Sequence, residues 1–378
     1  MIEQKRLGDI ATYINGFAFK PEDRGTVGLP IIRIQDLTGN AYDLGFYAGN
    51  YPERIEINDG DVLISWSASL GVYVWDKGKA LLNQHIFKVV FDKCEVNREY
   101  FVYAVRYKLK EMESKTHGAT MKHIVKKDFD NTLIPFPTLE EQENIANLLD
   151  KISTIILVRQ QQLQKLDELV KARFVEMFGD PVTNPMDWPT KPLLEMGYCK
   201  NGMNFHTGDS GIEMHCLGVG DFKDYSVIDG TDYLPTISLN EAPPEESMLQ
   251  DGDLVFVRSN GNKALVGRCL LVYPHNTPTT YSGFCIRYRL TSAEVNIAYL
   301  LRVLKTDSMR KKMAGRGANI QNLNQQILAA LNIPTPPLEL QEWFTAFIEQ
   351  IDKSKVAVQK SLDEAQLLFD SLMQQYFG

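Results

Sequence analysis

The sequence lacks any motif that pairs its cysteines. Its five cysteines are Cys94, Cys199, Cys216, Cys269 and Cys285, and no two of them form a C-x-x-C motif. An odd number of isolated cysteines predicts reduced thiols in a cytoplasmic protein rather than a disulfide framework. His206, His215 and Cys216 do not have the spacing of a zinc site, so we expect no metal centre.

Long hydrophobic runs are also missing. The longest weakly polar stretch, residues 63–75, is interrupted by three serines and a glycine. It is too short to cross a bilayer and is rich in strand-forming residues. The first ten residues contain no apolar segment of the kind found in signal peptides. We therefore expect a cytoplasmic protein that has no membrane partner.

Motifs for catalysis are absent as well. There is no G-x-x-x-x-G-K-[ST] loop for nucleotide phosphates, and no glycine-rich dinucleotide fingerprint follows a predicted strand. Residues 184–188 match the N-P-P-aromatic motif of amino-methyltransferases only imperfectly. Residues 113–115 offer E-x-K without a positioned aspartate before it. The sequence therefore predicts a chain that is not an enzyme and binds no cofactor of its own.

The net charge of −8 is unevenly distributed. Residues 1–133 carry 18 basic and 18 acidic side chains, and residues 180–332 carry 14 and 16. Residues 134–179 carry 5 and 7, and residues 333–378 carry 3 and 7, which accounts for −6 of the total. The acidic charge therefore lies mainly outside the two large segments, and these segments can carry basic patches.

An internal duplication is the strongest feature of the sequence. Residues 134–179 align without a gap to residues 333–378, at a constant offset of 199, with 13 identities in 46 positions. Both copies open on I-P-x-P-x-L-E-x-Q-E. The prolines favour an extended entry, after which Thr138 and Glu141 can form a capping box in the first copy. The second copy has Pro337 instead, which suits a helix start.

Each copy is predicted to form one long helix. Apolar residues recur at heptad spacing and form one stripe along each copy, which indicates a coiled coil. The stripe of the first copy contains Leu149, Ile152, Ile156, Leu163, Leu166 and Val170, and is interrupted by Arg159 and Arg173. The stripe of the second contains Ile348, Ile351, Val358, Leu362, Ala365, Phe369 and Leu372, and is interrupted by Lys355. Two separate surface helices, each packed on its own domain, are the alternative.

The remaining segments repeat more weakly and predict α+β domains. Asn15-Gly16-Phe17 corresponds to Asn201-Gly202-Met203, and an Asp-Gly-Asp turn recurs at residues 59–61 and 251–253. The fold class is α+β, with two globular domains alternating with two long helices that pair antiparallel, related by a pseudo-twofold internal repeat. The predicted parts are a first globular domain (1–133), a first helical arm (134–179), a proline-rich linker (180–192), a second globular domain (193–332) and a second arm (333–378).

Basic clusters occupy corresponding places in the two globular domains. One lies in residues 106–127 and the other in residues 302–316. A solvated helix face would explain either cluster alone, but two clusters at matching places favour contact with phosphates. The predicted phosphate-contacting residues are Lys108, Lys115, Lys126, Lys127, Arg310, Lys311 and Lys312.

Polar loops follow these clusters and also follow two buried strands. Arg, Asn, Gln and Lys are the side chains that read base edges in the major groove. The predicted DNA-binding residues of the first domain are Lys20, Arg33, Ser65, Trp66, Ser67, Ser69, His117, Thr120, Lys122 and His123. Those of the second domain are Asn204, Arg258, Ser259, Asn260, Asn262, Lys263, Arg316, Asn319, Gln321 and Asn322.

With two variable domains, each followed by an arm that opens on P-x-P-x-L-E-x-Q-E, the chain resembles the specificity subunit of type I restriction–modification systems. The resemblance covers the whole chain. It implies a non-catalytic subunit that binds double-stranded DNA through two target-recognition domains. It also implies partners that serve phage defence, namely two modification methyltransferase subunits using S-adenosylmethionine, and restriction subunits using ATP and Mg²⁺. The host would be a bacterium or an archaeon.

Together these features predict how the chain works. Two equal arms that pair antiparallel would place the recognition domains in inverted orientations, so the target would be asymmetric and in two parts, with a fixed spacer between them. Gln142, Glu143, Gln341 and Glu342 are predicted to dock the partner subunits on the arms. The alternative function is a coiled-coil scaffold whose globular domains bind other proteins.

Overall fold

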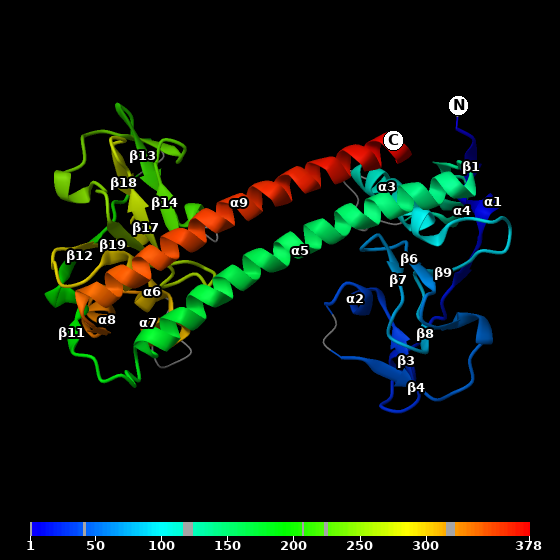
Figure 1. The fold of residues 1–378 in the computed structure, drawn as a ribbon, viewed down its shortest axis with the longest axis horizontal. Coiled ribbons are helices and arrows are strands. Elements are labelled where there is room, and N and C mark those ends of the chain that lie inside the picture. Colours follow the sequence, from blue (N-terminus) through cyan, green and yellow to red (C-terminus); the bar gives the residue numbers. More distant parts are fainter. Residues whose placement is uncertain (1, 41–42, 116–123, 206–207, 223–225, 315–321) are drawn as a thin grey trace. The chain divides into compact units, whose positions relative to one another are not determined.

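The computed structural model describes residues 2–40, 43–115, 124–205, 208–222, 226–314 and 322–378 (Figure 1). The chain divides into two compact units. The first unit contains Met1–Gln161 and Val358–Gly378, and the second contains Gln162–Ala357. Each unit therefore combines one globular domain with half of each long helix.

The first unit is built from short strands and a few helices. Its strands are β1 (Gln4–Arg6), β2 (Thr12–Asn15), β3 (Leu29–Ile32), β4 (Gly45–Tyr47), β5 (Glu56–Ile57), β6 (Val62–Ser65), β7 (Gly71–Val74), β8 (Ala80–Leu82), β9 (Ile86–Val90) and β10 (Leu133–Pro135). Its helices are α1 (Leu7–Ile10), η1 (Pro21–Asp23), α2 (Ile34–Leu37), η2 (Glu53–Ile55), α3 (Arg98–Lys115) and α4 (Lys126–Asp130). The strands form sheets with the orders β2-β9-β6-β7, β4-β3-β8-β5 and β1-β10.

The second unit follows the same plan. Its strands are β11 (Thr190–Pro192), β12 (Gly197–Asn201), β13 (Ile212–Leu217), β14 (Val227–Asp229), β15 (Thr236–Leu239), β16 (Asp253–Val257), β17 (Cys269–Tyr273), β18 (Thr279–Tyr281), β19 (Cys285–Leu290) and β20 (Asn332–Pro334). Its helices are η3 (Leu193–Glu195), η4 (Val219–Asp221), η5 (Glu245–Ser247), α6 (Ile297–Lys305), α7 (Asp307–Ala314) and α8 (Gln325–Ala329). The sheet orders are β12-β19-β16-β17-β14, β15-β13-β18 and β11-β20.

A short antiparallel strand pair leads into each long helix. Lys5 pairs with Ile134 in the first unit and Lys191 with Ile333 in the second, so the repeat predicted from the sequence extends to the backbone register. The long helices are α5 (Leu139–Phe178) and α9 (Leu338–Phe377), each of 40 residues. At about 1.5 Å per residue, each is roughly 60 Å long.

The predicted capping box begins α5. The Thr138 N–H donates to Glu141 Oε2 (3.0 Å), and the Glu141 N–H donates to Thr138 Oγ1 (3.3 Å). These bonds satisfy helix-start donors that have no partner within the helix, and they lower the pKa of the Glu141 carboxyl. The cap therefore fixes where helix α5 starts.

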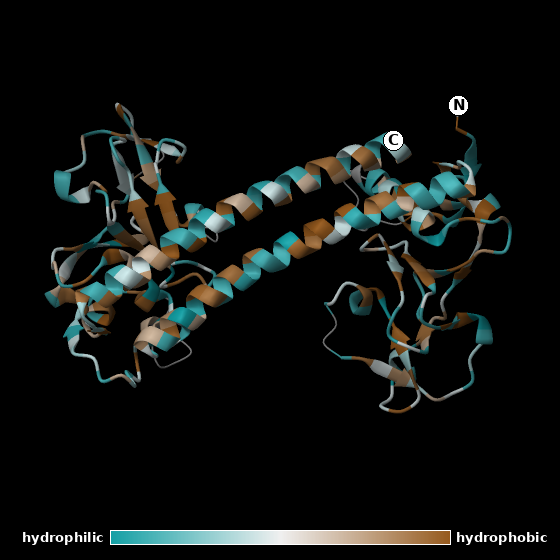
Figure 2. Ribbon diagram, in the orientation of Figure 1, coloured by the Kyte–Doolittle hydropathy of each residue, from teal (hydrophilic) through white to brown (hydrophobic). Residues whose placement is uncertain are grey.

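The heptad stripes are confirmed in both helices. Every member of the two predicted stripes is buried or half-buried, and polar residues alternate with them along both ribbons (Figure 2). In the first unit, Leu149 of α5 shares a hydrophobic core with Met373 and Phe377 of α9. In the second unit, the end of α5 meets the start of α9, and Phe174 packs edge-on against Phe344 at 5.6 Å. The start of one helix lies beside the end of the other, which is antiparallel pairing.

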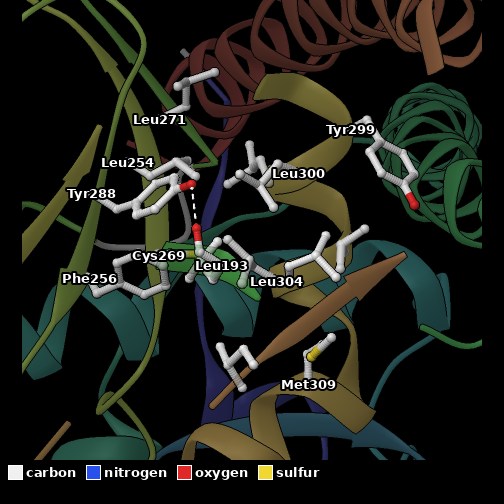
Figure 3. Close-up of a cluster of buried hydrophobic side chains, with 14 of the residues drawn as sticks. Leu193, Leu254, Phe256, Cys269, Leu271, Tyr288, Tyr299, Leu300, Leu304 and Met309 are labelled. Atoms are coloured by element: carbon white, nitrogen blue, oxygen red, sulfur yellow. Dashed lines mark hydrogen bonds between the residues drawn. The ribbon is translucent and has the colours of Figure 1, made fainter. Parts of the chain in front are cut away.

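The core of the second unit lies between its sheet and α6 (Figure 3). Leu254, Phe256, Leu271 and Tyr288 come from the sheet, and Leu300 comes from α6. The Tyr288 hydroxyl donates to the Leu193 carbonyl oxygen at 3.0 Å. In the first unit, Tyr13 makes the same kind of bond to the Leu7 carbonyl oxygen at 2.9 Å. Among the described residues, no helix combines the length and the apolar character of a membrane span.

Candidate nucleic-acid interface

In the first unit, the polar segment predicted after strand β6 meets Ile124 and His85 at one junction. Strand β6 ends at Ser65, and the backbone of Trp66 is held on both sides. The Trp66 N–H donates to the His85 carbonyl oxygen at 3.2 Å, and the Ile124 N–H donates to the Trp66 carbonyl oxygen at 3.0 Å. The strand-end loop therefore adjoins the chain that follows the basic helix.

The second unit repeats this junction at corresponding residues. Strand β16 ends at Val257, and the Arg258 N–H donates to the Phe284 carbonyl oxygen at 2.8 Å. The Leu323 N–H donates to the Arg258 carbonyl oxygen at 2.8 Å. His85 and Ile124 of the first unit lie 199 residues before Phe284 and Leu323. We call these two places the first and second junctions.

Glycine allows a third segment to reach each junction. A Cβ on Gly16 would overlap the carbonyl oxygen of Asn83, and a Cβ on Gly202 would overlap that of Ser282. This close approach requires glycine, and it brings the predicted residue Asn204, which is exposed, to the second junction. Lys20, also exposed, follows the corresponding segment of the first unit and lies 4.0 Å from Glu22.

Three of the predicted DNA-binding residues of the first unit are buried, and we correct those predictions. Arg33 is 8% exposed, and its Nε donates to Asp36 Oδ2 at 2.9 Å, which raises the pKa of the guanidinium. The Ser65 hydroxyl donates to the Ser69 carbonyl oxygen at 2.6 Å, and Ser67 is buried beside it. Arg33 and Ser65 use their polar groups in bonds within the chain and Ser67 is buried, so we no longer assign these three residues to DNA contact.

Two other residues of this loop remain at the surface. Ser69 is exposed. Trp66 is half-buried, its ring stacks on Phe87 at 5.5 Å, and its Nε1 donates to Asn15 Oδ1 at 3.3 Å. The indole is therefore held rigidly at the edge of the junction.

The loop of the second unit is ordered by its own side chains. The Arg258 guanidinium donates to the Gly283 carbonyl oxygen at 3.2 Å, and Ser259 forms a β-bridge with Asn322. The side-chain oxygen of Asn260 accepts from the Asn262 N–H at 2.8 Å. The side-chain oxygen of Asn262 in turn accepts from the Ala264 N–H at 3.0 Å. Lys263 is exposed. The predicted residues of this loop therefore lie together.

The basic residues of the first unit differ in how exposed they are. Lys108 is half-buried with its Nζ 3.2 Å from Glu111, and Lys126 pairs with Asp130 at 2.7 Å. Lys127 is exposed. The backbone of Lys115 ends α3, and its side chain lies outside the described part of the structure. Of these residues, Lys127 is best placed for phosphate contact.

In the second unit a hydrogen bond connects the basic cluster to the loop at the junction. Arg310 of α7 is half-buried and donates to the Ala264 carbonyl oxygen at 3.0 Å, and burial lowers the pKa of its guanidinium. Lys311 and Lys312 are exposed on the same helix. The bond from Arg310 therefore ties these two lysines to the loop of Arg258.

Seven predicted residues fall outside the described part of the chain. They are His117, Thr120, Lys122, His123, Arg316, Asn319 and Gln321. Their assignment as DNA-binding residues stays a prediction.

The structure corrects the docking role predicted for two glutamines. Gln142 is 1% exposed, and its side chain accepts from the Asn97 N–H at 3.0 Å and donates to the Pro137 carbonyl oxygen at 2.9 Å. Gln341 is fully buried and makes equivalent bonds to the Asn296 N–H (2.8 Å) and the Pro336 carbonyl oxygen (2.7 Å). Both side chains hold a recognition domain to its arm.

The other two predicted docking residues, Glu143 and Glu342, are exposed.

Sequence reasoning missed a second element of the domain–arm contact. The Tyr100 hydroxyl donates to the Pro135 carbonyl oxygen at 2.8 Å, and that of Tyr299 donates to the Pro334 carbonyl oxygen at 3.0 Å. The motif N-x-x-Y recurs at residues 97–100 and 296–299, at the same offset as the arms, so this signal was available.

The junctions carry hydrogen-bonding side chains, among them Trp66 and Asn15 in the first and Arg258 in the second. No cluster of three His, Cys, Asp or Glu side chains that could hold a metal ion occurs among the described residues. Burial raises the pKa of the Cys216 thiol to about 12 and that of Cys269 to about 11, so both thiols stay protonated at neutral pH. Rigid backbone, exposed lysines and side chains that suit base edges are the features of a nucleic-acid interface.

Comparison with known proteins identifies the family to which the chain is similar. The model described as the type I restriction modification DNA specificity domain matches residues 2–168 and 242–365. The specificity subunit of the type I restriction enzyme StySPI from Salmonella potsdam is 25% identical over 406 residues, covering 97% of this chain and 86% of that protein. The EcoBI specificity subunit from Escherichia coli is 29% identical over 168 residues, covering 44% of this chain and 35% of that protein.

Two solved structures share the fold along nearly the whole chain. The S subunit of a type I restriction–modification system from M. genitalium superposes with a TM-score of 0.58 at 15% identity, covering 100% of this chain and 96% of that one. A chain from a study of complex assembly and conformational transition in a type I system superposes with a TM-score of 0.62 at 17% identity. That likeness covers 99% of this chain and 97% of the other.

Proposed function

This chain belongs to the family of type I restriction–modification DNA specificity subunits, and from this we propose that it reads an asymmetric, two-part DNA site with a fixed spacer and docks two methyltransferase subunits. The observation that carries the proposal is the pair of junctions. Their backbone bonds correspond between the units, whereas Trp66 and His85 of the first are replaced by Arg258 and Phe284 in the second. A shared frame with different side chains suits two recognition sites of different sequence.

The arms supply the constant part of this function. Each is one continuous helix of 40 residues that contributes a half to each unit. Helices that pair antiparallel present inverted surroundings to the two recognition domains, so the half-sites are read in opposite orientations. The length of the helices sets the number of base pairs between the half-sites, whose sequence the chain does not recognise.

The exposed faces of the arms support partner docking. Glu143 and Glu342 occupy equivalent exposed positions near the helix starts. Three apolar side chains of α5 are also exposed, namely Leu148, Ile155 and Leu169. Exposed apolar side chains on one element support contact with another protein. Since the two arms are copies of one sequence, each offers a site for one methyltransferase subunit. In this proposal S-adenosylmethionine, ATP and Mg²⁺ are bound by the partner subunits.

The proposal also assigns the parts of the chain. Residues 1–133 and 193–332 are the recognition domains, 134–179 and 333–378 the arms, and 180–192 the linker. We propose that Lys127, Lys311 and Lys312 contact phosphates, which carry the affinity, while the junction side chains carry the specificity. The proposed location is the cytoplasm.

One experiment tests this function. Host DNA is sequenced for methylated adenine in strains with and without this chain. We expect one asymmetric two-part motif to lose methylation when the chain is removed. A continuous palindrome, or no change, would contradict the proposal. Binding of the assembled complex to that motif should also weaken steeply with salt, by about one logarithmic unit of slope per phosphate contact.

A further inference from the structure

We propose that the turns β8–β9 and β18–β19 are specificity elements, and that Phe284 contacts the methyl group of a thymine in the half-site read by the second unit. This inference rests on the proposed function and names residues of its reading surface. Neither turn was among the segments that the sequence marked as DNA-binding.

The two turns are held by the same backbone bonds. Residues 83–85 link β8 to β9, and residues 282–284 link β18 to β19, so each turn joins the two larger sheets of its unit. In the first unit, Asn83 N–H donates to the Ile32 carbonyl oxygen (3.0 Å), Gln84 N–H to that of Phe17 (2.9 Å), and Trp66 N–H to that of His85 (3.2 Å). In the second unit, the corresponding bonds run from Ser282 N–H to Leu217 (3.0 Å), from Gly283 N–H to Met203 (2.6 Å), and from Arg258 N–H to Phe284 (2.8 Å). The backbone of both turns is therefore a common frame.

On this frame the side chains differ at every position of the turn. Asn83-Gln84-His85 corresponds to Ser282-Gly283-Phe284. Side chains that only supported the frame would be expected to match, because the bonds that they surround match. Differences confined to side chains on an unchanged backbone are what two readers of different DNA sequences require.

Phe284 is the most exposed part of its turn. Its side chain is 61% exposed, whereas Tyr281 and Cys285, the residues that flank the turn 282–284, are fully buried. The Phe284 carbonyl oxygen accepts from the N–H groups of Arg258 and Ser259 at 2.8 and 3.3 Å, and its own N–H donates to Ser282 Oγ at 3.3 Å. The ring is thus presented to solvent from a rigid backbone, so binding through it loses little conformational entropy.

The surroundings of the ring indicate DNA as the occupant. The Arg258 guanidinium donates a hydrogen bond to the Gly283 carbonyl oxygen. The side-chain oxygen of Asn204 occupies the space where a Gly283 side chain would be. Arginine suits guanine and asparagine suits adenine, while an apolar ring beside them suits the methyl group of thymine. Arg310 bonds to the same loop at the Ala264 carbonyl oxygen, and Lys311 and Lys312 are exposed on the helix that carries it.

At the corresponding place in the first unit the chemistry is polar. Gln84 is exposed, and His85 packs edge-on against the Trp66 ring at 4.9 Å. Glutamine is suited to the N6 and N7 edge of adenine. The turn of the first unit therefore offers no exposed apolar side chain for a thymine methyl group.

The test uses the full-length chain assembled with the methyltransferase subunit of its host, and duplexes that carry the site found by methylome sequencing. Each thymine of the second unit's half-site is replaced in turn by deoxyuridine, which removes only the 5-methyl group. We expect one replacement to weaken wild-type binding about fourfold, the value for one buried methyl group. The variant Phe284→Ala should bind at least about fourfold more weakly and should not respond to that replacement.

Two controls separate this role from general damage. Tyr233→Ala removes an aromatic ring with the same 61% exposure, from a segment outside the junction, and should leave the response to deoxyuridine unchanged. Phe284→Leu keeps an apolar contact and should keep part of the response. The other half-site should be read equally well by all three variants.

The outcomes are distinguishable. Unchanged binding and an unchanged response to deoxyuridine in Phe284→Ala would overturn this inference and leave the proposed function intact. The same change in Tyr233→Ala would also overturn it, because the effect would then be general. If the wild-type complex shows no sequence preference at all, the proposed function fails and the inference fails with it.

Discussion

Buried glutamine side chains hold both recognition domains to their arms. Gln142 and Gln341 each place one amide between a domain backbone and the proline-rich entry of a helix, with both ends of the amide bonded. A buried amide that satisfies two backbone groups contributes through the cost of leaving those groups unpaired. This explains why the glutamine belongs to the opening motif of both arms.

Replacing Gln341 should therefore lower stability. Gln341→Ala leaves the Asn296 N–H without its partner, and we expect a loss of about 2 kcal/mol in the free energy of unfolding. For a unit of this size the midpoint of thermal unfolding should fall by about 4–8 °C, measured by calorimetry. Glu342→Ala, at the neighbouring exposed position, should change it little. A Gln341→Ala variant that is stable but no longer binds methyltransferase would restore the docking role.

A charged pair interrupts the apolar contact between the two long helices. Lys355 occupies a position of the heptad stripe in α9, is half-buried, and has its Nζ 2.5 Å from Asp167 of α5 and 3.7 Å from Asp352. A polar residue at such a position reduces stability while it specifies the register of the helices. The pair therefore favours one alignment of the arms.

Replacing Lys355 should stabilise the helix pair. We expect Lys355→Leu to raise the free energy of unfolding by about 1 kcal/mol, since a half-buried ion pair contributes less than apolar packing of the same volume. The measurement is denaturant unfolding of the full chain. Lys353→Leu, exposed and off the stripe, is the matched control and should have no such effect. A decrease for Lys355→Leu would show that the ion pair stabilises the helices on balance.

At the scale of the whole molecule, the arms combine one constant length with two variable domains. The division between the units falls at Gln161 and Gln162 in α5, and at Ala357 and Val358 in α9. An insertion of equal length at both places keeps the heptad stripes of all four helix halves. It also leaves the junctions of both units untouched.

Such an insertion tests whether the arms set the spacer. One heptad added at both places lengthens each helix by about 10 Å. Because base pairs rise about 3.4 Å, the recognised spacer should grow by about three base pairs, with both half-sites unchanged. Methylome sequencing of a strain that carries the insertion gives the new spacer. An unchanged spacer with full methylation would refute this role of the arms.

Local and periodic features of this protein were determined by the sequence alone. The repeat at an offset of 199, the cap at Thr138 and the heptad stripes follow from short-range rules, in which proline, capping side chains and apolar spacing act within a few residues. For the same reason the two long helices and their starts could be predicted, and the resemblance to the specificity family could be stated from the arm motif.

Only the tertiary structure decided which polar side chains are available. Gln142 resembles a surface residue in the sequence, but it is buried because the backbone N–H from which it accepts belongs to Asn97, 45 residues away in the chain. Arg33 and Ser65 also resemble surface residues and are buried, although their bonded partners Asp36 and Ser69 are close in the sequence. Phe284 resembles a core residue, yet it is exposed because its turn crosses from one sheet to the next. Burial of a single side chain depends on contacts between distant segments, and periodicity within one segment does not report them.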